Sequence, residues 1–439
     1  MEQPDLERIV EQALALARKR GATAAEAGVG VGSGLSVTVR LGEVETLEYQ
    51  RDRSLGVTVY VGQRKGSAST ANLTPSAVEE TVSKALSIAS FTAEDEYSGL
   101  PDAELMAREL PDLDLCHPWD IDAPGAIELA KRCEAAGLAV DSRIRNSEGA
   151  SIATHRKMRV LGNSHGFIGG YPSTSHTVSC VVLGQANGEM QRDYWYTAAR
   201  DWRELEDVEE VGRKAAGRAI GRLGAGKLQT RKAPILFAPE VARGLIGHFV
   251  GAIGGGAQYR RSSFLLDAAG QQIFPPGISL NERPHLQGAL GSAPFDGEGV
   301  ATRDRDLVVN GVLGGYLLDA YSARKLGLTS TGNAGGVHNL VVQGDRLDQD
   351  ALLKGLGTGL LITEMMGQGV NPVTGDYSRG ASGFWIENGA VDRPVHEITV
   401  AGNLRDMYQG IIALGDDLDR RGAIHCGSIL IEQMTIAGD

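Results

Sequence analysis

The first 225 residues carry the same order of predicted elements twice: a helix, a run of strands and a second helix. The first copy spans about 1–92 and the second about 122–225, with an acidic, proline-containing connector between them. Consecutive strands joined by short turns favour antiparallel pairing, and the flanking helices supply apolar faces to cover a sheet. We therefore expect residues 1–225 to form one α+β region of two related halves.

The helices and strands of this region are predicted from local patterns. Apolar residues spaced at three and four positions, with capping residues such as Thr74 and Asp122, predict helices over 6–20, 75–90, 123–136 and 203–223. Alternating apolar runs predict strands over 35–41, 44–49, 55–61, 150–155, 158–161, 165–171, 177–183 and 190–198.

Residues 226–439 carry the strongest turn signals in the chain. Asn-Gly pairs at 310–311 and 388–389 each separate two strand-like runs, and this pair supplies the positive φ that a type I′ hairpin turn requires. A proline begins a predicted helix over 239–253, and a later helix is predicted over 404–414. We expect a mainly antiparallel β domain with short helices, built as a curved sheet or barrel-like sandwich with glycines at its bends.

Charge and cysteine usage argue against several classes of protein. The formal net charge is −12, which repels phosphate backbones, so we expect no direct nucleic-acid binding. No apolar run is long enough for a membrane span, and the N-terminal residues are acidic and polar. The cysteines, Cys116, Cys133, Cys180 and Cys426, form no CxxC pair, which indicates reduced thiols in a cytoplasmic protein.

A zinc-peptidase motif is the feature that decides between functions. Zinc peptidases commonly hold the metal with two histidines on one helix and place a glutamate beside the first. The pair His396-Glu397 begins such a motif, but Val400 stands at the next ligand position and the surrounding pattern is that of a strand. We therefore expect no complete zinc-protease site in this chain.

His425-Cys426 is a second suggestive pair. Adjacent residues of a strand point apart, so both reach one metal only if the backbone bends, which Gly422 and Gly427 permit. A lone buried cysteine more often behaves as a small hydrophobe than as a ligand. The sequence has no G-x-S-x-G motif, and its glycine run at 355–359 follows a helix where a dinucleotide fingerprint follows a strand.

Two loops, 330–336 and 369–380, are dense in Gly, Ser and Asn. Loops of this kind on a β scaffold often bind ligands, although surface crossovers with special turns explain them equally well. Their residues supply our candidate substrate or partner contacts: Asn333, Asn371, Asp376, Tyr377, Ser378 and Arg379.

These loops and their context resemble the TldD/PmbA family, and specifically its PmbA branch, also called TldE. The resemblance covers nearly the whole chain and is weaker over the first 225 residues. It is carried by Asp296–Thr302, Gly314–Gly327, Ser330–Ala334, Gly369–Gly389 and Val395–Leu404.

The resemblance implies one subunit of a two-subunit cytoplasmic zinc metallopeptidase that acts on unfolded or modified peptides. In that family the TldD-type subunit carries an HExxxH helix and a further cysteine ligand, and the PmbA-type subunit lacks the motif. For this chain it implies no cofactor of its own, zinc on a TldD-type partner, and a peptide channel shared with that partner. Whether the isolated chain forms a homodimer stays open.

Alignment with the metal-binding helix places Gly247 and Ala252 at the histidine positions and His248 at the glutamate position. Cys426 matches the cysteine position. Neither glycine nor alanine has a side-chain atom that coordinates zinc, so the resemblance implies a subunit that is inactive alone.

Two alternatives remain open at this point. One is an independent hydrolase whose metal site uses Cys426, His425, His248 or His338. The other is a non-proteolytic binding or scaffold protein that forms a homodimer.

Overall fold

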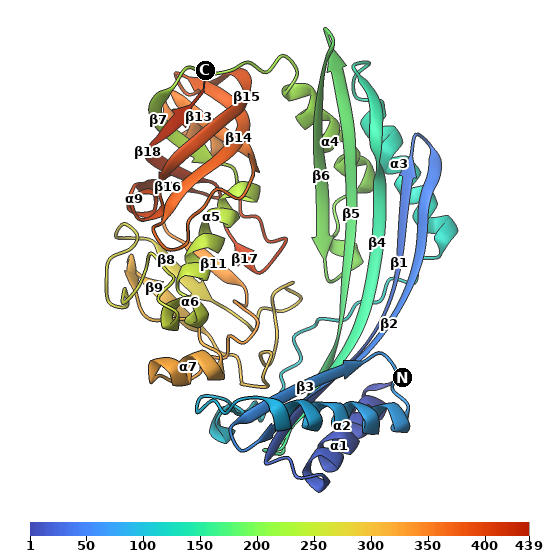
Figure 1. Cartoon of the computed structure of the whole chain (residues 1–439). Helices are drawn as coiled ribbons and strands as arrows, with labels where there is room; N and C mark the ends of the chain where they lie inside the picture. The colour runs from blue at the N-terminus through green and yellow to red at the C-terminus, as the bar shows by residue number, and fades with distance from the viewer. Residues whose placement is uncertain (439) are drawn as a thin grey trace.

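The computed structural model describes residues 1–438, which form an open curved sheet and, facing it, a second half built around a β-barrel (Figure 1). The open sheet has the order β3-β2-β1-β4-β5-β6, and all its neighbours are antiparallel. Its strands are β1 (Ala24–Arg40), β2 (Glu43–Val61), β3 (Arg64–Thr70), β4 (Ile144–Asn163), β5 (Ile168–Ala186) and β6 (Glu189–Ala199).

Several short predicted strands are wrong in their bounds, because each is part of one longer strand. The predicted runs 44–49 and 55–61 are both β2, and 150–155 and 158–161 are both β4. The polar residues between them stay in the ladder, as Ser33 pairs with Arg51, since backbone hydrogen bonds do not depend on side-chain polarity. The strand β3 was not predicted at all.

Each end of the sheet is covered by its own pair of helices. At one end, α1 (Gln3–Lys19) and α2 (Pro75–Phe91) bury a core with β1 and β2, and at the other α3 (Ala123–Leu138) and α4 (Val208–Gly221) bury a second core. The helix predicted over 203–223 begins later than expected. Asp207 caps α4 by accepting hydrogen bonds from the amides of Glu209 and Glu210.

The second half contains a closed barrel. Strands β7, β13, β14, β15 and β18 form the ring, which closes where β18 pairs with β7. The seven strands of this sheet are β7 (Arg231–Phe237), β12 (Arg346–Leu347), β13 (Gly359–Met366), β14 (Asp376–Glu387), β15 (Ala390–Asn403), β16 (Ile411–Gly415) and β18 (Ile429–Ala437).

A smaller sheet packs below the barrel, with α5 (Pro239–Ala252) between the two (Figure 1). Its strands are β8 (Ser279–Glu282), β9 (Arg305–Val309), β10 (Val312–Leu313), β11 (Leu340–Gln343) and β17 (Ile424–His425). The remaining helices of this half are α6 (Gly255–Tyr259), α7 (Ala320–Leu326), α8 (Gln349–Leu356) and α9 (Leu404–Gln409).

The two predicted Asn-Gly hairpins are confirmed. Asn310 and Gly311 have φ of 50° and 82°, and Asn388 and Gly389 have φ of 52° and 75°. The helix predicted over 404–414 is wrong beyond α9, because the following residues form β16, which pairs with β18 and buries Ile411 and Leu414.

The expectation of an α+β chain with a barrel-like, mainly antiparallel second half is confirmed. Among residues 1–438, no helix combines the length and the hydropathy of a membrane span.

Candidate functional site

The helix α5 lies in the core of the barrel half, and its apolar face fixes its position. Leu245, Ile246 and Phe249 are buried, and Phe249 packs its ring 5.1 Å from that of Phe274. The hydroxyl of Tyr408 donates a hydrogen bond to the Leu245 carbonyl at 3.0 Å. A helix held on this face presents its remaining residues in a fixed direction toward its neighbours.

The positions aligned with zinc-binding histidines carry no metal donor. A Cβ built at Gly247 would lie 4.0 Å from the Cδ1 of Ile424, which is the residue before His425. Ala252 is buried, and its carbonyl accepts hydrogen bonds from Gln258 and Ser263, each at 2.7 Å. The zinc-helix positions therefore adjoin the C-terminal His-Cys segment, but these two side chains cannot bind a metal.

His248 faces Tyr377 of β14. Their ring centroids are 6.0 Å apart, and the Nε2 atom of His248 is buried without a hydrogen-bond partner in the described chain. Burial lowers the pKa of His248, and the charge of Arg379 lowers it further. Burial also raises the pKa of Tyr377 to about 12. The structure thus brings two of the predicted loop residues, Tyr377 and Arg379, to the helix that was expected to be degenerate.

Cys426 is buried, and its surroundings disfavour a thiolate. Burial raises its pKa, and the nearby charges of Asp417 and Asp419 act in the same direction. Asp417 accepts hydrogen bonds from the amide and the hydroxyl of Ser428, at 2.8 and 2.7 Å, which fixes the turn around the cysteine. Unless a metal cation lies beside it, this thiol stays protonated.

These residues do not fit a zinc ion. No group of three or more His, Cys, Asp or Glu side chains within residues 1–438 is arranged to hold a metal. His425 and the half-buried His338 each have a buried Nε2 atom that lacks a partner, but the structure does not gather them with Cys426 and His248 into such a group.

Asn333 is a structural residue of its loop. It is buried, and its amide donates to Glu282 at 2.7 Å while its carbonyl oxygen accepts from Arg305 at 2.7 Å. The amide nitrogen and the carbonyl oxygen of this side chain make their hydrogen bonds within the barrel half, so neither is free to contact a peptide.

Three further predicted contacts are exposed: Asn371 in the turn before β14, and Asp376 and Ser378 at the start of that strand. Asn371 accepts from the amides of Val373 and Thr374, and Asp376 accepts from the Thr374 hydroxyl at 2.6 Å. The Ser378 side chain is exposed. The turn is self-contained, and the structure does not bring Asn371 or Asp376 to α5.

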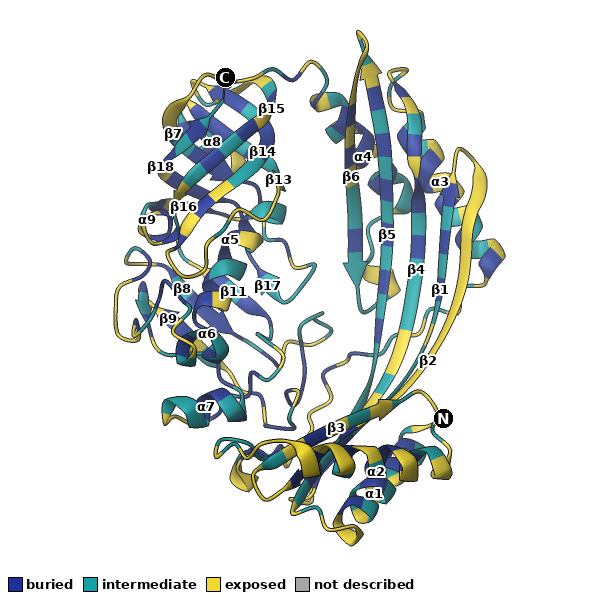
Figure 2. Ribbon diagram, viewed as in Figure 1, coloured by how far each residue is buried: buried dark blue, intermediate teal, exposed yellow. Residues whose placement is uncertain are grey.

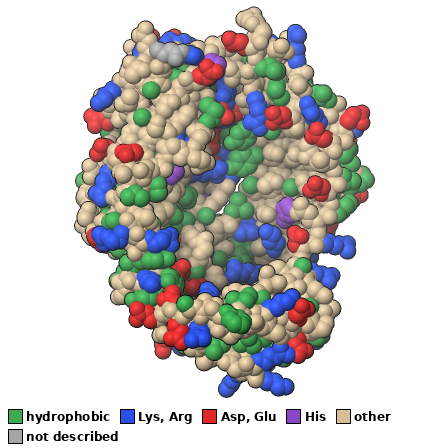
Figure 3. Space-filling model, in the orientation of Figure 1, with side chains coloured by type: hydrophobic (Ala, Val, Ile, Leu, Met, Phe, Trp, Pro, Cys, Tyr) green, Lys and Arg blue, Asp and Glu red, His purple; other side chains and the backbone are tan. Residues whose placement is uncertain are grey.

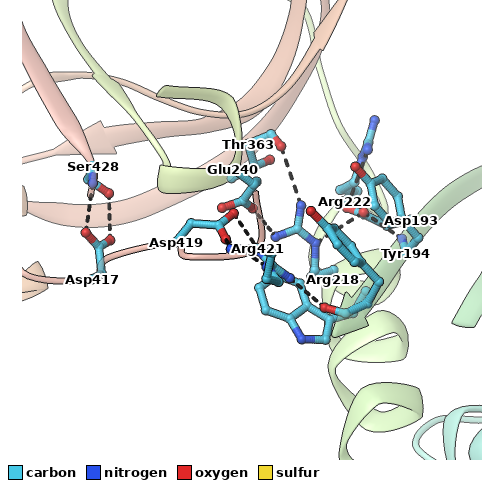
Figure 4. A network of polar contacts seen from close by, with 12 residues as sticks. Asp193, Tyr194, Arg218, Arg222, Glu240, Thr363, Asp417, Asp419, Arg421 and Ser428 are labelled. Carbon is cyan, nitrogen blue, oxygen red and sulfur yellow. Dashed lines mark hydrogen bonds and ion pairs between the residues drawn. The ribbon is translucent and has the colours of Figure 1, made fainter. Parts of the chain in front are cut away.

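A polar network that sequence reasoning missed joins α4 and β6 to the barrel half (Figure 4). Arg218 contacts Asp193 at 3.2 Å and Glu240 of α5 at 2.5 Å. Arg222 contacts Asp193 at 3.4 Å and Glu364 of β13 at 2.5 Å. Asp193 is almost fully buried, so its charge depends on these two guanidinium groups.

The same network continues to the segment before Cys426. Arg421 pairs with Asp419 at 2.9 Å, donates to the Tyr196 carbonyl at 2.6 Å and lies over the ring of Trp195 at 4.4 Å. Arg243 of α5 donates to the Tyr196 hydroxyl at 2.6 Å and contacts Asp419 at 3.4 Å. The N-terminal turns of α5 are therefore bound to the open sheet and α4 through charge-assisted contacts.

The molecule is hollowed between its halves, and Lys and Arg side chains are visible along the hollow (Figure 3). One cavity of about 500 Å³ lies where the end of β6 meets loops of the barrel half. It is lined by Ala198, Ala199, Arg200, Glu204, Leu286, Gln287, Gly288, Ala289, Leu290, Val341, Leu418, Arg420, Arg421 and His425. These residues are far apart in sequence, and no local motif predicts that they meet.

Three family models match this chain. They are described as PmbA/TldA metallopeptidase domain 1, central domain and C-terminal domain, and they match residues 25–89, 116–223 and 230–438. The chain belongs to the PmbA/TldD metallopeptidase family. The resemblance inferred from the loops is thereby confirmed.

Curated relatives of this family are similar along nearly their whole length. The metalloprotease PmbA of Escherichia coli O157:H7 is 52% identical over 403 residues, covering 92% of this chain and 90% of the relative. A PmbA homolog of Haemophilus influenzae is 48% identical, covering 100% and 97%. A crystal structure of a proposed modulator of DNA gyrase from Bacteroides thetaiotaomicron has a TM-score of 0.94 at 29% identity and covers all of both chains.

Proposed function

We propose that this chain is the non-catalytic subunit of a cytoplasmic zinc metallopeptidase made of two different subunits. Its partner is a TldD-type subunit that carries the HExxxH helix and the zinc. The substrates are unfolded or modified peptides, which pass through a channel formed between the subunits.

One observation carries this proposal. The chain belongs to a metallopeptidase family, and the resemblance aligns Gly247 and Ala252 of α5 with the histidines of the family's metal-binding helix; neither side chain has a donor atom. The neighbouring Cys426 is buried with a raised pKa. A chain that keeps the family fold without these donors needs a second subunit to supply the metal.

An unpaired strand edge supports association with such a subunit. Within residues 1–438, the part of β2 that precedes Leu55 has no strand paired to it on the side away from β1, because β3 pairs only with Leu55–Val61. The free stretch, Glu43–Ser54, is exposed throughout, as Figure 2 shows for the first part of β2. An open edge of this length is a template for strand addition by another chain.

Apolar side chains on this edge favour a protein partner. Val44, Leu47 and Tyr49 of this stretch are exposed by 43%, 45% and 68%, and Leu41 in the turn before β2 is exposed by 55%. Apolar side chains grouped on an open edge gain free energy when another protein covers them.

Co-elution on a sizing column tests the proposal. The purified chain mixed with its TldD-type partner should elute as one complex, and that complex should cleave unfolded peptides in a reaction that a zinc chelator abolishes. The isolated chain should cleave none. Separate elution of the two proteins, or chelator-sensitive cleavage by this chain alone, would contradict the proposal.

A further inference from the structure

The cavity at the end of β6 contains more positive charge than its protein partners balance. Arg200, Arg420 and Arg421 line it, and Glu204 is the one acidic residue of the lining. Arg421 is paired with Asp419. Arg200 and Arg420 form no ion pair with any residue in the described range 1–438. The lining therefore keeps two guanidinium groups without a carboxylate.

Arg200 is the more informative of these two residues. One terminal nitrogen donates to the Thr174 carbonyl at 2.9 Å and the other to the Leu290 carbonyl at 2.7 Å, which ties β5 to a loop of the barrel half. Its Nε atom is buried and has no partner in the described chain. Burial lowers the pKa of Arg200. These two hydrogen bonds explain the position of Arg200, but they leave a half-buried cation without a counter-ion and with a buried Nε that has no partner, which is costly.

His425 provides a second, independent sign of a ligand. It is only 4% exposed, it lines the same cavity, and its Nε2 atom has no hydrogen-bond partner in residues 1–438. Burial lowers the pKa of His425, so its ring is neutral, with one nitrogen able to donate and the other able to accept. A buried ring nitrogen without a partner disfavours the empty cavity.

We propose that this cavity binds the carboxylate of a peptide, with Arg200 and Arg420 as the cations that recognise it. A guanidinium group pairs with a carboxylate through parallel hydrogen bonds, and each terminal nitrogen of Arg200 keeps a second N–H beyond those that bind the Thr174 and Leu290 carbonyls. The adjoining peptide group would lie against the His425 wall of the cavity, which a simple inorganic anion does not do. The inference rests on the proposed function only in taking the ligand to be a peptide.

The cavity lies close to α5, so a ligand bound in it would be held near that helix. Its wall includes the segment from Leu418 to His425, and Ile424 of that segment packs beside Gly247 on α5. A carboxylate held by Arg200 would fix one end of a peptide, or one acidic side chain, close to the helix that corresponds to the family's metal-binding helix. The bound group thereby sets the position of the peptide along the channel.

Calorimetric titration of the full chain with three peptides tests the proposal. The peptides are an acetylated tetra-alanine with a free C-terminal carboxylate, the same peptide with a C-terminal amide, and an amide in which one alanine is replaced by glutamate. We expect the first peptide to bind and the plain amide not to bind. Binding of the glutamate peptide as well would assign acidic side chains as a second source of the carboxylate.

Variants locate the binding in this cavity. Arg420→Gln, at a side chain that is exposed and has no ion pair, should weaken binding of the carboxylate peptide about tenfold, and Arg200→Gln should weaken it more. Arg145→Gln, an exposed arginine of β4, is the matched control and should change nothing. Arg420→Gln keeps the test valid if loss of Arg200 disturbs folding.

Three results would overturn the proposal. They are equal binding of the carboxylate and the plain amide, no binding of either acidic peptide, and an unchanged affinity in Arg420→Gln and Arg200→Gln. Full competition by inorganic phosphate at equal concentration would also overturn it, because it would show a general anion site only. The titration needs neither zinc nor the partner, so its failure is separable from a failure to form the complex.

Discussion

The two halves of this chain differ in whether their sheets have an open edge strand. The barrel half closes its ring through the pairing of β18 with β7, whereas in the sheet half the first part of β2 pairs with β1 alone among residues 1–438. A closed barrel has no edge with which another strand can pair, and an open edge is available for association. The barrel half thus encloses α5 in a closed fold, while the sheet half has the open edge that the proposed second subunit would cover.

The largest expected effect tests the rigidity of the barrel half. Phe249→Ala removes a fully buried ring that packs on Phe274 and Tyr408, and it should lower the free energy of unfolding by about 3–5 kcal/mol. Phe91→Ala, at a ring that is 89% exposed at the end of α2, should change it by less than about 0.5 kcal/mol. Urea unfolding followed by circular dichroism measures both, and similar losses would contradict the comparison.

A smaller effect tests the ion pairs that connect the two halves. Arg218→Gln leaves Glu240 without its partner and Asp193 with only Arg222, so the free energy of unfolding should fall by about 2 kcal/mol. Arg132→Gln breaks an exposed pair with Glu209 and should cost less than about 0.5 kcal/mol. Equal losses in the two variants would show that the network does not hold the halves together.

A third prediction concerns pH at the other contact between the halves. Burial raises the pKa of Glu298 from 4.5 to about 7, with the charges of Asp296, Asp319 and Glu26 acting in the same direction. Between these pH values the folded chain holds a proton that the unfolded chain has lost, so stability falls as the pH rises from 4.5 to 7.

Replacing this carboxyl should remove that dependence. Glu298→Gln keeps an acceptor for the Ala320 amide and should stabilise the chain at pH 8 by on the order of 1 kcal/mol, with little change at pH 4.5. Thermal unfolding across this pH range measures the difference. A variant whose stability follows the parent at every pH would refute the assigned cause.

The smallest expected change in stability comes from the open edge. Leu47→Lys, at a side chain that is 45% exposed, should alter the free energy of unfolding by less than about 0.5 kcal/mol. It should nevertheless weaken association with the TldD-type partner at least about tenfold, because it places a charge in the proposed interface. Val309→Lys, at an exposed residue of β9, is the control in the barrel half and should leave association unchanged.

Local signals in the sequence predicted most of the elements. The Asn-Gly pairs at 310–311 and 388–389 define their hairpins because the required φ values are a property of two residues. The start of α4 and the strand β16 were missed, because the cap at Asp207 and the pairing of Ile411 with Ile431 override weak local preferences.

The candidate site was predictable only in part. Gly247, Ala252 and Cys426 could be located because the family resemblance assigns positions directly. Arg200 could not, since its significance comes from contacts with Thr174 and Leu290, which are distant in the sequence, and from an atom left without a partner. Unbalanced charge in a cavity is a property of the folded chain.

Zinc content is the most direct test of the central claim that this chain supplies no metal ligands. Elemental analysis should find about one zinc per complex with the TldD-type partner and essentially none in the chain purified alone. Stoichiometric zinc in the isolated chain, lost on Cys426→Ala, would contradict the claim and would identify a metal site of its own.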